Sequence, residues 1–135
     1  MATTFLLEIF SCDRIFYKGM AEEIIFPSLD GLQGILADHE PMISALVAGE
    51  LKFLVDGNWR YAAVSDGFVE ITQEHVTLLA DTVEAPEEID INRAQEAKLR
   101  AEERLRQKES IREYYHTQAA LSRAMARLGV TSKHI

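Results

Sequence analysis

The stretch HVTLLADTVEAPEEIDINRAQEAKLR, residues 75–100, contains the change of pattern that decides the fold. Its first part, HVTLLAD, is rich in β-branched and apolar residues and has the length of a strand. After residue 90 the apolar positions follow a helical spacing instead. These positions are Ala94, Ala97, Ala101 and Leu105. We therefore predict a β domain over residues 1–86 and a helical domain over residues 87–135.

The N-terminal part consists of short strand-like runs that alternate with turn signals. The runs are FLLEIF, EEIIFP, ELKFLVDG, WRYAAVS, GFVEITQ and HVTLLAD. The turn signals are SLDG, VDGN, SDG and QE, of which SDG (residues 65–67) is predicted to be a hairpin turn. Short connections favour antiparallel pairing, and this many strands must close or stack. We expect a β-sandwich or a barrel.

The C-terminal part predicts two helices. Asp90 is placed to cap the first helix, because its carboxylate can accept from the free amides of the first turn. Residues 110–113 (SIRE) match a capping box that starts a second helix, and Gly129 is predicted to end it. A short joint between two helices favours an antiparallel hairpin. Each helix alone is marginal in water, so the hairpin needs support from the β domain, a partner or a ligand.

Charge and composition exclude several classes of protein. The net charge is −8, and it is unevenly divided: residues 1–86 carry 4 basic and 14 acidic side chains, residues 87–135 carry 10 and 8. An acidic body argues against nucleic-acid binding. The single cysteine, Cys12, allows no internal disulfide. The N-terminus does not have the pattern of a signal peptide, and no apolar run has the length of a membrane span, so we expect no direct membrane insertion.

Candidate catalytic and metal-binding residues are few. The four histidines, at positions 39, 75, 116 and 134, lack metal-ligand spacing. Cys12 has no helix start nearby to activate its thiol. The segment DGLQG (30–34) has two glycines but neither the lysine nor the helix start of a phosphate loop. We therefore expect a protein that is not an enzyme, with no metal site and no prosthetic group.

Four arginines in the helical part allow two interpretations. They are Arg93, Arg100, Arg123 and Arg127, spaced so that each helix carries two on one face. In the first interpretation they belong to a solvated surface and pair with Glu96, Glu102, Glu103 and Glu113. In the second they converge in the folded hairpin and bind an anion, because guanidinium groups match phosphate oxygens.

Four segments together resemble one family. They are GLQGILADHEPM (31–42), VSDGFVEI (64–71), VTLLAD (76–81) and the I-D-x-x-R-A pattern at residues 89–94. In order and spacing they are similar to the epsilon subunit of bacterial F-type ATP synthase, over essentially the whole chain. The resemblance implies a ten-stranded β-sandwich of two five-stranded sheets over residues 1–86, followed by an antiparallel two-helix hairpin over residues 87–135.

The resemblance also implies a function. Members of this family are non-catalytic rotor subunits that join the gamma subunit to the ring of c subunits, at the cytoplasmic side of the bacterial cell membrane. Their helical tail inhibits ATP hydrolysis when it extends toward the catalytic beta and alpha subunits. Coupling to protons or sodium stays open. An alternative on composition alone is a generic adaptor, a β-sandwich with a coiled coil and no nucleotide site.

Some members of the family bind ATP through the tail, and this chain carries the matching positions. They are Glu84, Ile89, Asp90, Arg93, Ala94, Arg100, Arg123 and Arg127. The resemblance thus favours the anion-site interpretation and predicts ATP as a regulatory ligand. One position departs from the family: Leu32 stands where an acidic residue is usual, in the loop expected to face the c ring.

Overall fold

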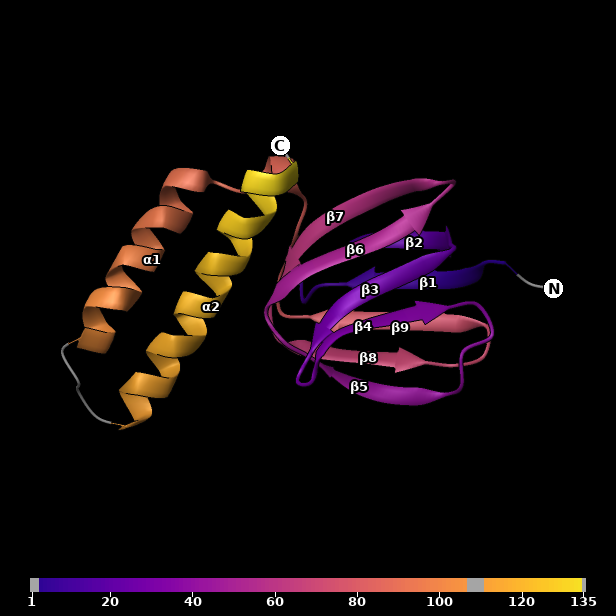
Figure 1. Cartoon of the computed structure of the whole chain (residues 1–135), viewed down its shortest axis with the longest axis horizontal. Coiled ribbons are helices and arrows are strands. Elements are labelled where there is room, and N and C mark those ends of the chain that lie inside the picture. Colours follow the sequence, from indigo (N-terminus) through magenta and orange to yellow (C-terminus); the bar gives the residue numbers. More distant parts are fainter. Residues whose placement is uncertain (1–2, 107–110, 135) are drawn as a thin grey trace.

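The chain folds as two packed sheets followed by two helices (Figure 1). The computed structural model describes residues 3–106 and 111–134, without the side chains of residues 111–113. One sheet has the order β2 (Ile15–Ala21), β1 (Phe5–Phe10), β9 (His75–Ala80), β8 (Gly67–Ile71), β5 (Met42–Leu46). The other has the order β10 (Val83–Glu84), β7 (Asn58–Val64), β6 (Gly49–Val55), β3 (Glu23–Ser28), β4 (Gly31–Leu36). The predicted ten-stranded sandwich is confirmed.

The hydrophobic core lies between the two sheets. Strand β1 shows the reason, because its residues alternate strictly between buried and half-buried positions, as expected for a strand with one face in a core. The largest fully buried side chains are Phe26 and Phe53. All fully and partly buried members of this core cluster fall within residues 5–83. The sandwich therefore contains a complete core without any contribution from the helices.

A fragment of residues 1–86 should consequently fold alone. We expect an all-β circular dichroism spectrum and a single cooperative transition in urea, because the fragment keeps every residue of the core cluster. Loss of the helices exposes Ala63, which costs little compared with the core. A fragment that is unfolded, or that shows helical signal, would contradict the predicted boundary.

One connection differs from the sequence prediction. The segment Ser65–Gly67 is not a hairpin turn: it carries the chain from β7 in one sheet to β8 in the other. The crossing is fixed by hydrogen bonds to distant loops. Ser65 Oγ accepts from the Thr82 amide at 2.7 Å, and Asp66 Oδ1 accepts from the Ala48 amide at 3.2 Å. The β1–β9 pair, which no short connection joins, is parallel.

The helices begin and end partly as predicted. A 3₁₀ turn, η1 (Pro86–Glu88), leads into α1 (Ile91–Arg106), and Asp90 caps α1 by accepting from the Arg93 amide at 3.0 Å. Helix α2 (Ile111–His134) runs through Gly129, so the predicted end at that glycine is wrong. The capping box predicted around Ser110 lies outside the described residues and side chains. Continuing past Gly129 lets α2 bury Val130 completely, which a helix ending there would not do.

The hairpin rests on the sandwich through the C-terminal end of α2 (Figure 1). Val130 is buried against Ala63 of β7 and Ile89 of the linker. Small buried residues, Ala94 and Ala101 on α1 and Ala124 on α2, suit a close approach of the two helices. The contact with the sandwich is small, so the hairpin is anchored mainly at one end.

Candidate functional site

A cleft of about 420 Å³ lies where α1, α2 and the end of β10 meet. Its lining combines guanidinium groups, carboxylates and two small side chains. The lining residues are Glu84, Glu88, Asp90, Arg93, Ala94, Ala97, Arg100 and Arg127. The alanines leave room beside α1, and the charged residues surround that space. We call this the arginine cleft.

Most of the residues predicted to bind ATP meet in this cleft. Six of them line it: Glu84, Asp90, Arg93, Ala94, Arg100 and Arg127. Ile89 does not, because its side chain is buried beneath, against Ala63 and Val130. Arg123 lies one turn before Arg127 on α2, and its half-buried side chain is not part of the lining. The structure thus assembles two arginines of α1 with one arginine of α2.

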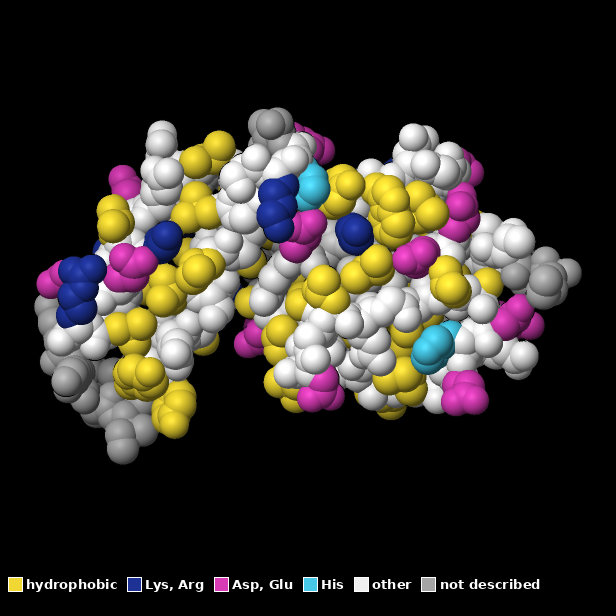
Figure 2. All heavy atoms as spheres, in the orientation of Figure 1, with side chains coloured by type: hydrophobic (Ala, Val, Ile, Leu, Met, Phe, Trp, Pro, Cys, Tyr) yellow, Lys and Arg dark blue, Asp and Glu magenta, His cyan; other side chains and the backbone are white. Residues whose placement is uncertain are grey.

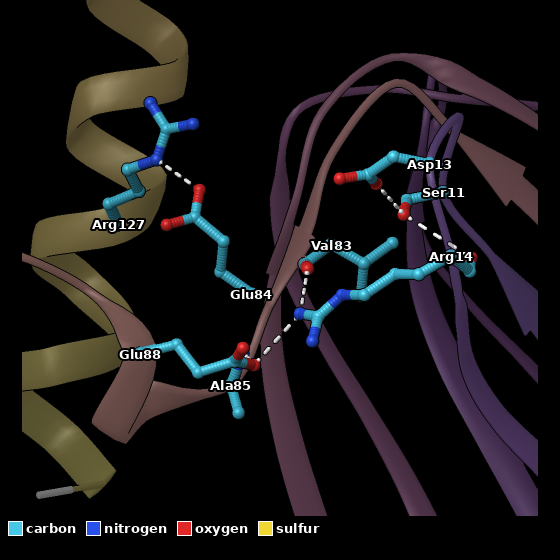
Figure 3. Close-up of polar contacts among 8 residues, drawn as sticks. All are labelled: Ser11, Asp13, Arg14, Val83, Glu84, Ala85, Glu88 and Arg127. Carbon is cyan, nitrogen blue, oxygen red and sulfur yellow. Dashed lines mark hydrogen bonds and ion pairs between the residues drawn. The ribbon is translucent and has the colours of Figure 1, made fainter.

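An ion pair joins the sandwich to the second helix at the edge of the cleft (Figure 3). Arg127 Nε donates to Glu84 Oε1 at 2.6 Å, and both side chains are less than one-third exposed. Glu84 is the last residue of β10, so the strand sets its position. This pair holds α2 against the exit of the sandwich and fixes one wall of the cleft.

A second contact fixes the linker between strand and helix (Figure 3). Arg14 donates to the Val83 carbonyl at 3.0 Å and to Glu88 Oε1 at 2.9 Å, while Glu88 also accepts from the Ala85 amide at 2.9 Å. The hydrogen bond with Glu88 raises the pKa of Arg14. The same bond, helped by the Ala85 amide, lowers the pKa of Glu88. The sequence pattern did not indicate Arg14 or Glu88 as residues of the site.

The turn that carries Arg14 is itself ordered by short-range hydrogen bonds. Ser11 Oγ donates to Asp13 Oδ1 at 2.7 Å, which lowers the pKa of the Asp13 carboxyl (Figure 3). Ser11 is buried, and its amide donates to the Arg14 carbonyl at 3.0 Å. The β1–β2 connection therefore presents Arg14 to the linker in a defined position.

The Arg14–Glu88 pair should make a small, acid-sensitive contribution to stability. Because folding lowers the pKa of Glu88 below the ordinary 4.5, the contribution is complete above that value and disappears as pH falls through the folded-state pKa. Both side chains are about two-fifths exposed, so we expect less than about 1 kcal/mol. The difference in urea unfolding between wild type and Glu88→Gln should be complete at pH 7 and should shrink as the pH falls below 4.5. A difference that stays constant down to the acid limit of the folded state would contradict this assignment.

The charges of the cleft favour an anionic ligand. Glu84 and Glu88 are already paired, and Asp90 caps α1. Among the described side chains, no carboxylate forms an ion pair with Arg93 or Arg100. Two of the glutamates expected as surface partners pair elsewhere, Glu102 with Lys98 and Glu103 with Arg106. Glu113 lies outside the described side chains. Two guanidinium groups on one helix thus face the cleft with their donors available.

Two kinds of feature are absent from the part of the chain that the structure describes. There, no group of three His, Cys, Asp or Glu residues has the geometry of a metal site. None of the helices there has the length and apolar character needed to cross a membrane.

Comparisons with known proteins cover the whole length of the fold. Residues 4–86 match the family model "ATP synthase, Delta/Epsilon chain, beta-sandwich domain", and residues 87–132 match the "long alpha-helix domain" of the same chains. The ATP synthase epsilon chain of Ruminiclostridium cellulolyticum is 51% identical over 130 residues, 96% of this chain and 97% of that one. That of Caldanaerobacter subterraneus is 49% identical over 135 residues, 99% and 98% of the two chains. A chain in the Euglena gracilis mitochondrial ATP synthase structure has the same fold, with a TM-score of 0.84 at 20% identity, covering 98% of this chain and 83% of that one.

Proposed function

Because the chain belongs to the ATP synthase epsilon chain family, we propose that it is a non-catalytic rotor subunit that joins the gamma subunit to the c ring. The sandwich suits this role, since its complete core makes a rigid body that can transmit torque. In the cell the protein would be peripheral, at the cytoplasmic side of the bacterial membrane. Leu32 of the β3–β4 hairpin is 74% exposed and would face the c ring.

The helical hairpin would act as a regulatory switch that responds to ATP. The observation that carries this proposal is the arginine cleft, where Arg93, Arg100 and Arg127 meet beside two alanines. In it the arginines would bind the phosphates. Glu84 and Asp90 would be better placed for the base or the ribose, because carboxylates repel phosphate. Ile89 would hold the linker in place from below, since it is buried.

ATP binding would shift the hairpin toward the folded state. The cleft is built from both helices and the sandwich, so it exists only when the hairpin is docked. A ligand that binds only this state stabilises it by about 2.7 kcal/mol at a hundredfold excess over Kd. That is enough to move a two-state equilibrium from mostly extended to mostly folded. When ATP falls, the released hairpin would reach the catalytic beta and alpha subunits and inhibit hydrolysis.

Titration of the full chain with ATP tests the nucleotide site. Calorimetry should detect one site per chain at or below millimolar ATP. No heat of binding at that concentration would favour the adaptor alternative for the hairpin.

Deletion of residues 87–135 from the assembled ATP synthase tests the division of labour. We expect ATP synthesis to continue, because the sandwich would carry the rotor contacts, and latent hydrolysis to change, because the switch is gone. Hydrolysis by membranes is measured before and after detergent activation. A truncated subunit that fails to join the rotor would contradict this division.

A further inference from the structure

The last turn of α2 makes a second, polar contact with the sandwich, outside the lining of the arginine cleft. The His134 imidazole stacks on the Tyr61 ring, with centroids 3.5 Å apart and planes 9° apart. Its Nε2 lies 2.9 Å from Glu50 Oε1, and Lys133 Nζ lies 3.5 Å from Glu50 Oε2. Figure 2 shows a histidine beside a basic and an acidic side chain where the helices meet the sandwich.

The His134 contact is more buried and more closely fixed in geometry than an ordinary ion pair at the surface. The His134 side chain is only 16% exposed although it sits at the end of the helix, whereas Lys133 is 66% exposed. Glu50 and Tyr61 come from β6 and β7, the two central strands on which α2 packs. A stacked ring and a hydrogen bond on the same imidazole fix its position in two directions.

The contact lies at the C-terminal end of α2, the helix that also carries Arg127. His134 follows Arg127 by seven residues, about two helical turns, so holding the helix end holds Arg127 near Glu84. Neither His134 nor its partners line the arginine cleft. We propose that His134, Tyr61 and Glu50 form a C-terminal clasp that keeps the hairpin docked and thereby sets ATP affinity without touching the nucleotide. This inference rests on the proposed function.

The coupling follows from the docked fraction of the hairpin. When only a fraction of the molecules is competent to bind, the apparent Kd rises by the inverse of that fraction. The docking contacts that stay include the Val130 cluster and the Glu84–Arg127 pair. Removing the clasp should therefore undock a measurable part of the population. His134, Tyr61 and Glu50 are positioning residues, since they would act through Arg127 and the rest of the cleft.

The first measurement reads docking without nucleotide. Hydrogen exchange of the full-length chain, followed over residues 91–106 and 124–134, should be faster in His134→Ala and Tyr61→Leu by about three- to tenfold. Tyr61→Phe should exchange like wild type, because it keeps the stacked ring. Glu70→Gln, an exposed substitution on β8, is the matched control for Glu50→Gln. Unchanged exchange in the strands would show that each variant is folded.

The second measurement is ATP affinity by calorimetry on the same variants. We expect a loss of about three- to tenfold in His134→Ala and Tyr61→Leu, a smaller loss in Glu50→Gln, and none in Tyr61→Phe or Glu70→Gln. Wild-type exchange in all variants would overturn the clasp, whatever the affinities. Faster exchange with no ATP binding by the wild type would support the clasp as a docking contact and refute the nucleotide site. Faster exchange with unchanged ATP affinity would overturn the coupling.

Discussion

Replacing Gly67 with alanine should destabilise the sandwich by about 3 kcal/mol or more, the largest stability effect that we expect from one added methyl group. A Cβ at this position would overlap the Leu79 carbonyl oxygen and would lie 2.8 Å from the Ala80 Cα. Both atoms belong to the backbone of β9, which is hydrogen-bonded on both sides and cannot move away easily. Urea unfolding followed by the fluorescence of Trp59, the single tryptophan, measures the loss.

Gly34→Ala is the matched control for this substitution. Gly34 also lies in a strand, β4, but a Cβ there would meet only Ile25 Cγ1 at an ordinary 3.7 Å. We expect a change within about 0.5 kcal/mol. If both alanine variants unfolded at the same urea concentration as wild type, the close approach of β8 and β9 at Gly67 would be wrong.

Replacing Arg100 with alanine should weaken ATP binding by about ten- to a hundredfold, the largest effect that we expect on the ligand. A charge-assisted hydrogen bond contributes about 1.5–3 kcal/mol, and Arg100 lines the cleft with no ion pair among the described side chains. Arg100→Lys should recover only part of the affinity, since an ammonium group cannot form the two-pronged contact. Calorimetry on the full-length chain measures both.

The control for Arg100 lies on the same helix. Arg104 is exposed and does not line the cleft, so Arg104→Ala should bind ATP like the wild type. Arg123→Ala tests the family pattern against the ligand-free geometry. Because Arg123 lies outside the lining, a loss as large as that of Arg100→Ala would require its side chain to swing toward the nucleotide. If all three alanine variants bound ATP as tightly as the wild type, the arginines would belong to a solvated surface and not to an anion site.

The residue pattern predicted the interior of the sandwich better than its borders. The six strands found from the pattern are the central ones of both sheets. The four that it missed are β2, β4, β5 and β10, which are the four edge strands. An edge strand is less buried, so apolar and polar residues alternate weakly along it. In β4 the two glycines and exposed Leu32 leave Ile35 as the only fully buried residue.

For the site, the sequence predicts contacts between residues that are close along the chain, but not contacts between residues that are far apart along it. The I-D-x-x-R-A pattern is local, so the placement of Asp90, Arg93 and Ala94 on one helix start could be predicted. The contact of Arg14 with Glu88 joins residues 74 positions apart, and nothing in either segment indicates the other. The predicted helix end at Gly129 is wrong for a related reason. A glycine ends a helix by local preference, but burial of Val130 against a strand decides otherwise.

The parallel pairing of β1 with β9 has a consequence for synthesis on the ribosome. Strand β1 lies in the interior of its sheet, and its neighbour on one side, β2, follows at once, but the other neighbour begins at His75. Until about 80 residues have left the exit tunnel, β1 lacks this second neighbour. During that time its apolar residues Leu7 and Ile9 are exposed to aggregation. The helices leave the tunnel only afterwards, so they meet a surface whose core already lies outside the ribosome.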